Sequence, residues 1–293
     1  MIKRAPKSAF LFLCAIALIL AWRPLRDALW LATHDEEYTH LLLIFPIAAA
    51  LISLEWRSLE SWLAPGPRAG LLLLGISLLV AGFARWLPHL PPDERLTGNM
   101  LALVIWLLGS FVLCFGTRVS RALLFPLGFS FLAVPLPRLV LNEIVTWLQH
   151  GSAWAAHCLF SIARVPVSQD GLLVSIPGLT VEVATECSSI RSSSMLLVIT
   201  MVFAQLFLRT PWRKWLLIFL AIPVSVAKNG LRIFTIAMLS TRVDPAYLTG
   251  KLHHQGGVVF LAIALAGIFL VLWILRRNDR VSSPRPLPNP AAG

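Results

Sequence analysis

The sequence predicts an all-α polytopic membrane protein, with about eight transmembrane helices, a small extracytoplasmic amphipathic segment and a β-hairpin. Hydrophobic residues make up 57% of the 293 positions and charged residues only 13%, about half the charged share of soluble domains. The mean hydropathy is +0.78. This composition excludes an ordinary soluble enzyme and a disordered chain. The net charge of +11 does not indicate a nucleic-acid partner, because the basic residues are dispersed in small groups between apolar runs.

Eight apolar runs approach the roughly 20 residues that a helix needs to cross a bilayer. They are 8–22, 39–54, 69–84, 98–115, 119–134, 192–208, 214–239 and 257–275. We expect the first run to be retained as a span rather than removed as a signal peptide, because no small-residue cleavage site follows it.

The basic residues predict the orientation of these spans. With the N-terminus inside and eight alternating spans, the inner segments hold fourteen basic and three acidic residues. The outer parts hold ten basic residues, among them Arg232 in the outer half of the seventh run, and eleven acidic residues. Cytoplasmic segments of membrane proteins are enriched in Lys and Arg. We therefore expect a multi-pass protein of the cell inner membrane with both termini in the cytoplasm.

One outer connection, 135–191, is much longer than the others. Within it, residues 139–164 have the pattern of an amphipathic helix, on which Trp147, Trp154 and Phe160 share a pattern with His150 and His157. Next, alternating β-branched residues flank a Pro-Gly pair in 172–184, as in a hairpin with a type II turn. We expect a single transmembrane domain over 1–275 and a disordered cytoplasmic tail over 276–293.

Cys187 differs from the other three cysteines, because it lies in a polar run that leads directly into an apolar span. If Thr185 or Ser188 caps that helix, Cys187 is in or near its first turn, where unpaired N–H groups favour a thiolate. Arg191, four residues on, would share its helical face and stabilise the thiolate further. The alternative is that Cys187 is only a small residue at the start of a Ser-rich helix that packs closely on its neighbours, and this segment favours neither interpretation.

Arg232 is an arginine inside the seventh apolar run, and a charge at such a depth is a functional candidate by default. Asn229, one turn earlier, is a candidate to hold its guanidinium group, and Lys228 is expected to snorkel toward the surface. The alternative is a structural arginine paired with Glu186 or Glu182.

His253 and His254 precede the last span on the outer side. No CxxC motif and no third ligand accompany them, so the sequence predicts neither a metal nor a cofactor. The topology places Cys187, Arg232 and this histidine pair at one face of the membrane. A thiolate, a guanidinium and an imidazole are the groups that acyl transfer through a thioester requires.

The chain resembles the exosortase/archaeosortase family of polytopic cysteine transpeptidases in four places. These are Asp35-Glu36-Glu37-Tyr38-Thr39-His40, the Cys187 segment up to Ser192, the run from Asn229 to Ile233, and His253 with Gly257 and Phe260. The resemblance implies that Cys187 is the nucleophile and that Arg232 and His253 are catalytic. His254, Arg191, Glu186 and Asn229 are alternate or supporting candidates. Ser189 and the Thr185-Glu186 pair depart from the usual motif, which suggests a less familiar subfamily.

The resemblance also implies the substrate and the partners. Family members act on exported proteins with a C-terminal sorting tail, which consists of a Pro-Glu-Pro type motif, an apolar helix and a basic end. They cleave near the motif and pass the protein to the envelope or to exopolysaccharide machinery. The active site would then lie on the extracytoplasmic side, in contact with membrane lipid.

Two alternatives remain open at the level of the sequence. Charged residues within a span and Pro223 in the same run suit a transporter or permease, although no inverted repeat is visible. The other alternative is a non-catalytic scaffold for envelope assembly.

Overall fold

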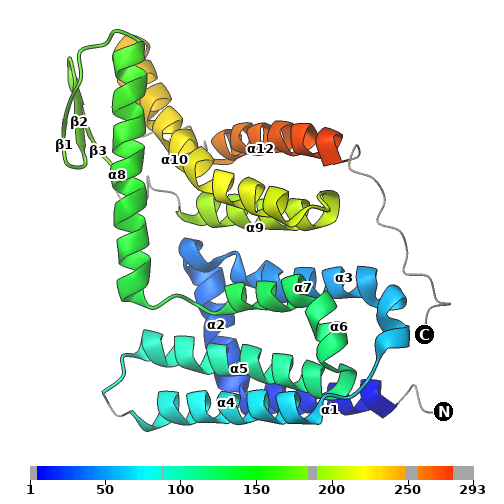
Figure 1. The fold of residues 1–293 in the computed structure, drawn as a ribbon. Coiled ribbons are helices and arrows are strands. Elements are labelled where there is room, and N and C mark those ends of the chain that lie inside the picture. Colours follow the sequence, from blue (N-terminus) through cyan, green and yellow to red (C-terminus); the bar gives the residue numbers. More distant parts are fainter. Residues whose placement is uncertain (1–4, 88, 184–189, 249–256, 280–293) are drawn as a thin grey trace. The chain divides into compact units, whose positions relative to one another are not determined.

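The computed structural model describes residues 5–87, 89–183, 190–248 and 257–279, and it is almost entirely helical (Figure 1). Within these residues, six helices are long and apolar enough to cross a membrane, and the number rises to eight if each of two sharply bent helix pairs counts as one span. The prediction of an all-α polytopic membrane protein is confirmed, and the expected eight spans are the upper end of this range.

The chain divides into two compact units, residues 1–144 and 145–293. The helices of the first unit are α1 (Ala5–Leu20), α2 (Trp22–His34), η1 (Glu36–Tyr38), α3 (Leu41–Leu59), η2 (Glu60–Trp62), α4 (Pro67–Trp86), α5 (Pro92–Phe115), α6 (Thr117–Ala122), α7 (Leu124–Phe129) and η3 (Ser130–Ala133). Helix α8 (Arg138–Ile162) begins in the first unit and continues into the second.

The first predicted span is the beginning of a bent helix pair rather than an isolated straight helix. Helices α1 and α2 meet at an angle of 73°. Pro24 has no N–H group to donate to the carbonyl of Leu20, four residues earlier, so the helix is interrupted there. The Leu20 carbonyl instead accepts a hydrogen bond from Arg85 Nη2 at 3.4 Å.

The fifth predicted span, 119–134, consists of short pieces: most of α6, then α7 and η3. Residues Leu124–Ala133 and helix α8 form the second bent pair, with an angle of 97°. Pro135 and Pro137 lie between them, and proline disfavours helical conformation in the residue before it. The two prolines therefore explain why the chain turns before α8.

Helices α4 and α5 pack side by side along much of their length (Figure 1). A Cβ atom on Gly70 would lie only 2.6 Å from the Leu113 Cα atom, so this close approach requires glycine. Ser77 Oγ donates a hydrogen bond to the Ala102 carbonyl across the same interface, at 2.7 Å. Small residues allow this approach, as is typical of helix pairs in membranes.

The second unit contains the rest of α8, a small sheet and three long helices. Helix α8 is amphipathic, as predicted: Ala153, Ala156 and Phe160 are buried in one core with residues of the sheet and of α10. The two tryptophans, Trp147 and Trp154, are exposed. The expected grouping of Phe160 with these tryptophans is therefore wrong, because Phe160 lies on the buried face.

The predicted hairpin is present as β2 (Leu173–Ile176) and β3 (Leu179–Glu182), which pair antiparallel. Gly178 has φ = +84°, the conformation that the third position of a type II turn requires and that glycine adopts without strain. The sequence analysis missed a third strand, β1 (Ser168–Asp170), which pairs with the other edge of β2. Its signal was Gly171, because hairpin turns favour glycine at the first of their two central positions.

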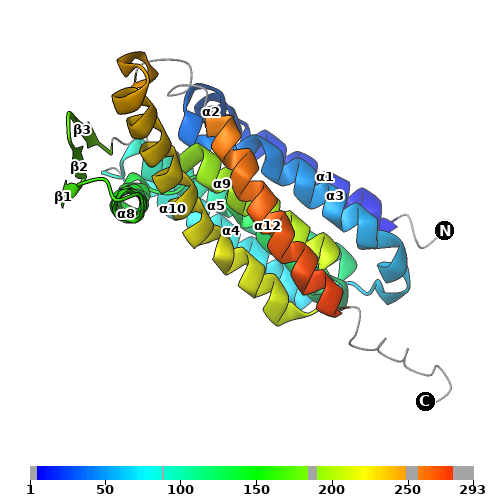
Figure 2. The ribbon, with the colours of Figure 1, turned by 90° about the horizontal axis from the view of Figure 1, so that it is seen from above.

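Helices α9 (Ile190–Phe207), α10 (Pro211–Arg242) and α12 (Gly257–Asp279) pack against one another, and η5 (Pro245–Leu248) follows α10 (Figure 2). Leu196, Leu217 and Ile268, one from each long helix, are fully buried in their shared core. Most of the tail predicted to be disordered, from residue 280 onward, lies outside the described residues. The single-domain prediction for 1–275 stays a prediction.

Candidate active site

The structure describes three of the seven predicted site residues: Arg191, Asn229 and Arg232. Cys187, Glu186, His253 and His254 lie outside the described residues. The description of α9 begins at Ile190, three residues after Cys187, and that of α12 begins at Gly257. The described part of the site is therefore the part that α9 and α10 carry.

Helix α10 buries three polar side chains close together in an otherwise apolar stretch. Lys228, Asn229 and Arg232 are only 5%, 1% and 8% exposed. Lys228 and Arg232 are four residues apart, so their side chains leave the same face of the helix. Charged groups at this depth are costly, which restricts them to positions inside a helix bundle and favours a functional role. We refer to these three residues as the α10 polar cluster.

Asn229 is bound to α8 and not to its neighbour Arg232. Its Nδ2 donates a hydrogen bond to Ser152 Oγ at 2.9 Å. Its Oδ1 is buried and has no hydrogen-bond partner among the described residues. The expectation that Asn229 holds the Arg232 guanidinium is therefore wrong in this structure. Sequence analysis missed Ser152, because a serine on an amphipathic helix gives no signal of its partner on another helix.

Close packing of α8 on α10 makes this hydrogen bond possible. A Cβ atom at Gly230 would lie 2.5 Å from Ala155 Cβ and 2.9 Å from the Ala156 backbone nitrogen. Real Cβ atoms do not approach other atoms so closely, so residue 230 must be glycine for the two helices to keep this spacing. The glycine in the Asn229-Gly230 pair thus positions the asparagine against Ser152.

Lys228 turns inward to α9 instead of snorkelling. Its Nζ donates a hydrogen bond to Ser192 Oγ. One turn earlier on α10, Ser225 Oγ donates to Ser193 Oγ at 2.6 Å. The snorkelling expectation is wrong because Ser192 of α9 provides Lys228 with a polar partner within the bundle. The Ser-rich start of α9 is therefore an interface with α10.

The alternative counter-ion Glu182 is not available to Arg232. Glu182 is exposed at the end of β3 and forms no ion pair with any residue that the structure describes. Glu186, the other candidate, lies outside those residues. Arg191 is exposed in the first turn of α9, two positions from the inward-facing Ser193.

The α10 polar cluster therefore provides concentrated positive charge and an unpartnered amide oxygen in a buried setting. Charge–charge interactions are much stronger in such surroundings than in water. Fixed cationic donors of this kind stabilise an anion, such as a thiolate or the oxyanion of an acyl-transfer intermediate. Within the described residues, no group of three or more His, Cys, Asp or Glu side chains could hold a metal ion.

The first of the four sequence motifs, 35–40, folds as a compact turn between α2 and α3. Asp35 Oδ1 accepts a hydrogen bond from the Glu37 backbone N–H at 3.0 Å, and the Asp35 carbonyl accepts one from Tyr38 N–H at 3.2 Å. His40 Nδ1 lies 3.2 Å from the Glu37 carbonyl. Burial lowers the pKa of His40, which keeps the imidazole neutral at pH 7.

The fold and the α10 polar cluster define a multi-pass helical membrane protein with charged side chains buried among its helices. The family model of the transmembrane exosortases (Exosortase_EpsH) matches residues 30–270, so the chain belongs to the transmembrane exosortase family. The matched range contains all four motifs. No match was found among curated proteins or among solved structures.

Proposed function

We propose that the chain is a cysteine transpeptidase that removes the C-terminal sorting tail of exported proteins. The observation that carries the proposal is the burial of Arg232 on α10, in a cluster whose neighbour Lys228 binds Ser192. Ser192 is five residues after Cys187, the proposed nucleophile. Membership of the exosortase family supports the assignment.

The proposed reaction has two steps. The Cys187 thiolate attacks the carbonyl carbon of the scissile peptide, and the C–N bond breaks as the tail leaves with a free amine. His253, with His254 as the alternate, supplies the proton that this amine needs. Arg232 stabilises the oxyanion, while Arg191, Glu186 and Asn229 support these groups. An acceptor then attacks the thioester and regenerates the thiolate.

The substrate in this proposal is a protein anchored by its own apolar tail helix. Its Pro-Glu-Pro type motif would be extended at the extracytoplasmic surface of the inner membrane, with the basic end of the tail inside, in agreement with the charge rule. The product passes to the cell envelope or to exopolysaccharide machinery.

Mass spectrometry of a tail-bearing protein, coexpressed with the wild-type chain or with Cys187→Ala, tests the proposal. We expect the wild-type chain to release the tail at one peptide bond and the variant to leave it intact, while both accumulate equally in the membrane. Normal tail release by Cys187→Ala would refute the nucleophile assignment.

A transporter is the second candidate, because α10 carries two buried cations and contains Pro223 within the helix. The same Cys187→Ala variant separates the two functions. A transporter retains solute uptake when this thiol is removed, whereas the proposed transpeptidase loses its activity.

A further inference from the structure

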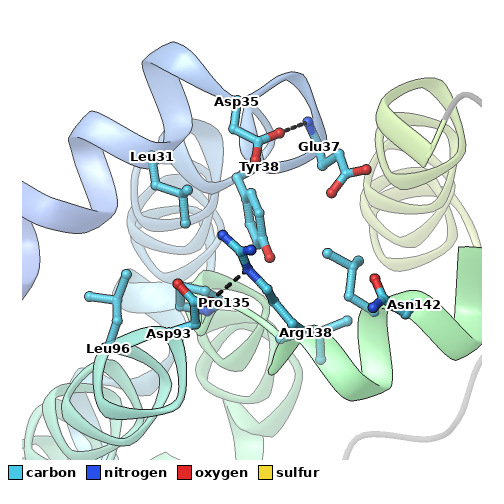
Figure 3. Close-up of a pocket in the computed structure, with 11 residues that line it drawn as sticks. Leu31, Asp35, Glu37, Tyr38, Asp93, Leu96, Pro135, Arg138 and Asn142 are labelled. Atoms are coloured by element: carbon cyan, nitrogen blue, oxygen red, sulfur yellow. Dashed lines mark hydrogen bonds and ion pairs between the residues drawn. The ribbon is translucent and has the colours of Figure 1, made fainter. Parts of the chain in front are cut away.

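A polar pocket in the first unit has no part in the chemistry proposed above. It has a volume of about 320 Å³, and its polar lining residues are Asp35, Glu37, Tyr38, Asp93, Arg138 and Asn142 (Figure 3). They come from the end of α2, from η1 and from the first turns of α5 and α8. We call it the Tyr38 pocket.

The Tyr38 hydroxyl group points into this pocket without a partner. The side chain belongs to a residue that is only 7% exposed, and Figure 3 shows its oxygen directed into the space between Glu37 and Arg138. No described residue forms a hydrogen bond with this hydroxyl. Burial and the surrounding carboxylates raise the pKa of Tyr38 to about 12, so the group stays protonated. The hydroxyl group can therefore donate one hydrogen bond and accept others from a ligand in the pocket.

The charges around the pocket favour a cationic ligand. Three carboxyl groups line it against one guanidinium group. Arg138 Nε lies 2.6 Å from Asp93 Oδ2, so these two charges compensate each other. Asp35 and Glu37 form no ion pair with any residue in the described part of the chain. The pocket therefore keeps an excess of negative charge at Asp35 and Glu37.

The hydrogen-bond acceptors in the pocket suit a primary ammonium group better than a quaternary one. A primary ammonium has three N–H donors, which two carboxylates and a hydroxyl oxygen can accept. A quaternary ammonium has no N–H donor and is recognised by a cage of aromatic rings. Tyr38 is the one aromatic residue among those that line the pocket.

The position of the pocket adds a second requirement. Its residues lie at the ends of α2 and α5, and α5 is long and apolar enough to cross a membrane. The ends of membrane-crossing helices are where lipid headgroups are found. Arg138 uses Nε for Asp93, and its Nη groups donate no hydrogen bond to any residue that the structure describes. A guanidinium group with these donors remaining is suited to a phosphate oxygen.

We propose that the Tyr38 pocket binds a phosphoethanolamine group, with the ammonium between Asp35, Glu37 and the Tyr38 hydroxyl and the phosphate at Arg138. The group is that of a phosphatidylethanolamine headgroup or of free phosphoethanolamine. This binding does not depend on Cys187, so it stands or falls separately from the transpeptidase activity.

Native mass spectrometry of the full-length protein tests this proposal. The purified protein is exposed to equal amounts of phosphatidylethanolamine, phosphatidylcholine and phosphatidylglycerol, or to free phosphoethanolamine alone. We expect about tenfold more retained phosphatidylethanolamine than phosphatidylcholine, because only the former can donate ammonium hydrogen bonds. Stronger binding of free phosphoethanolamine than of either lipid would assign the soluble source to the same pocket.

Substitutions of residues that line the Tyr38 pocket test whether the lipid binds there. The Asp35→Asn/Glu37→Gln double variant is expected to abolish the preference, and Tyr38→Phe to weaken it several-fold. Glu143→Gln is the matched control, since Glu143 is an exposed acidic residue next to Asn142 on α8 that does not line the pocket. Thermal unfolding of each variant verifies the fold. Equal retention of the two zwitterionic lipids without binding of free phosphoethanolamine, or a preference that survives in a folded double variant, would overturn the proposal.

Discussion

The α10 polar cluster and the Tyr38 pocket both place polar side chains in a largely apolar protein. They differ in whether these side chains have partners within the described residues. In the cluster, Lys228 and Asn229 bind serines on neighbouring helices. In the pocket, the Tyr38 hydroxyl and two carboxylates surround a cavity without cationic partners within the described residues. The cluster is cationic and takes part in helix packing, whereas the pocket is acidic and open to a ligand.

This difference follows from where each set lies on its helices. The cluster is within α10, where a polar atom can reach only an adjacent helix. The pocket residues are at helix ends, where side chains can face solvent and lipid headgroups. A polar group in the middle of a helix therefore has a packing role whether or not it is catalytic, while polar groups at helix ends are easier to interpret as a binding site.

The largest expected effect comes from Arg232→Lys in the cluster. Lysine keeps the charge but loses the planar, forked set of donors, so we expect tail release to fall about 100-fold. The measurement is the rate of tail cleavage by the protein in liposomes. Arg242→Lys, at the exposed end of the same helix, is the control and should retain full activity. A near-normal rate for Arg232→Lys would exclude a direct role for the guanidinium.

A large loss of stability is expected from Gly230→Ala, because the new methyl group would overlap with Ala155 and with the α8 backbone. Overpacking of this kind costs about 1–3 kcal/mol. Gly75→Ala on α4 introduces the same change with no atom within 4 Å of the new Cβ, and should stabilise the helix by about 0.5–1 kcal/mol. Unfolding in SDS mixed micelles measures both. An equal change in the free energy of unfolding for the two variants would contradict the tight α8–α10 contact.

A smaller effect is expected from Ser152→Ala, which removes the partner of Asn229 Nδ2. Hydrogen bonds between helices in membranes contribute about 0.6 kcal/mol on average and up to about 1.7 kcal/mol. The same unfolding measurement should show a loss in this range. Ser53→Ala is the control, since Ser53 is exposed and binds only the carbonyl of Ala50 in its own helix. An equal loss in both variants would mean that the bond to Asn229 contributes nothing.

The smallest change in stability, a gain instead of a loss, is expected from Glu37→Gln in the Tyr38 pocket. Burial, followed by the charge of Asp35, raises the pKa of Glu37. An acid with a higher pKa in the folded state binds more protons when folded, so the protein loses stability as the pH rises from the usual glutamate pKa through the raised one. Without ligand, Glu37→Gln should therefore stabilise the protein at neutral pH, by about 0.5 kcal/mol or less.

The unfolding midpoint measured from pH 4 to pH 8 checks this prediction. The difference between wild type and Glu37→Gln should grow with pH, whereas the exposed Glu143→Gln variant should follow the wild type. A Glu37→Gln protein that is less stable than wild type at pH 7 would show that this carboxylate stabilises the fold and is not held in place for a ligand.

The sequence could indicate Arg232 because a charge within an apolar run is visible without any knowledge of the fold. It also indicated the 135–191 connection, since Pro177-Gly178 and the amphipathic pattern are local signals. It could not give the partners of Asn229 and Lys228, because Ser152 and Ser192 are 77 and 36 residues away. Both serines are ordinary small residues of helices until another helix packs against them.

By itself, the sequence determined the membrane class, most of the spans and the candidate site residues, because composition, short-range periodicity and a charge within an apolar run are properties of the chain alone. Only the tertiary structure decided which way Lys228 turns, what Asn229 binds, and that the motif around Tyr38 meets Asp93 and Arg138 in one pocket. These outcomes depend on which helices lie next to one another and how closely, and glycine contacts such as that of Gly230 set that distance.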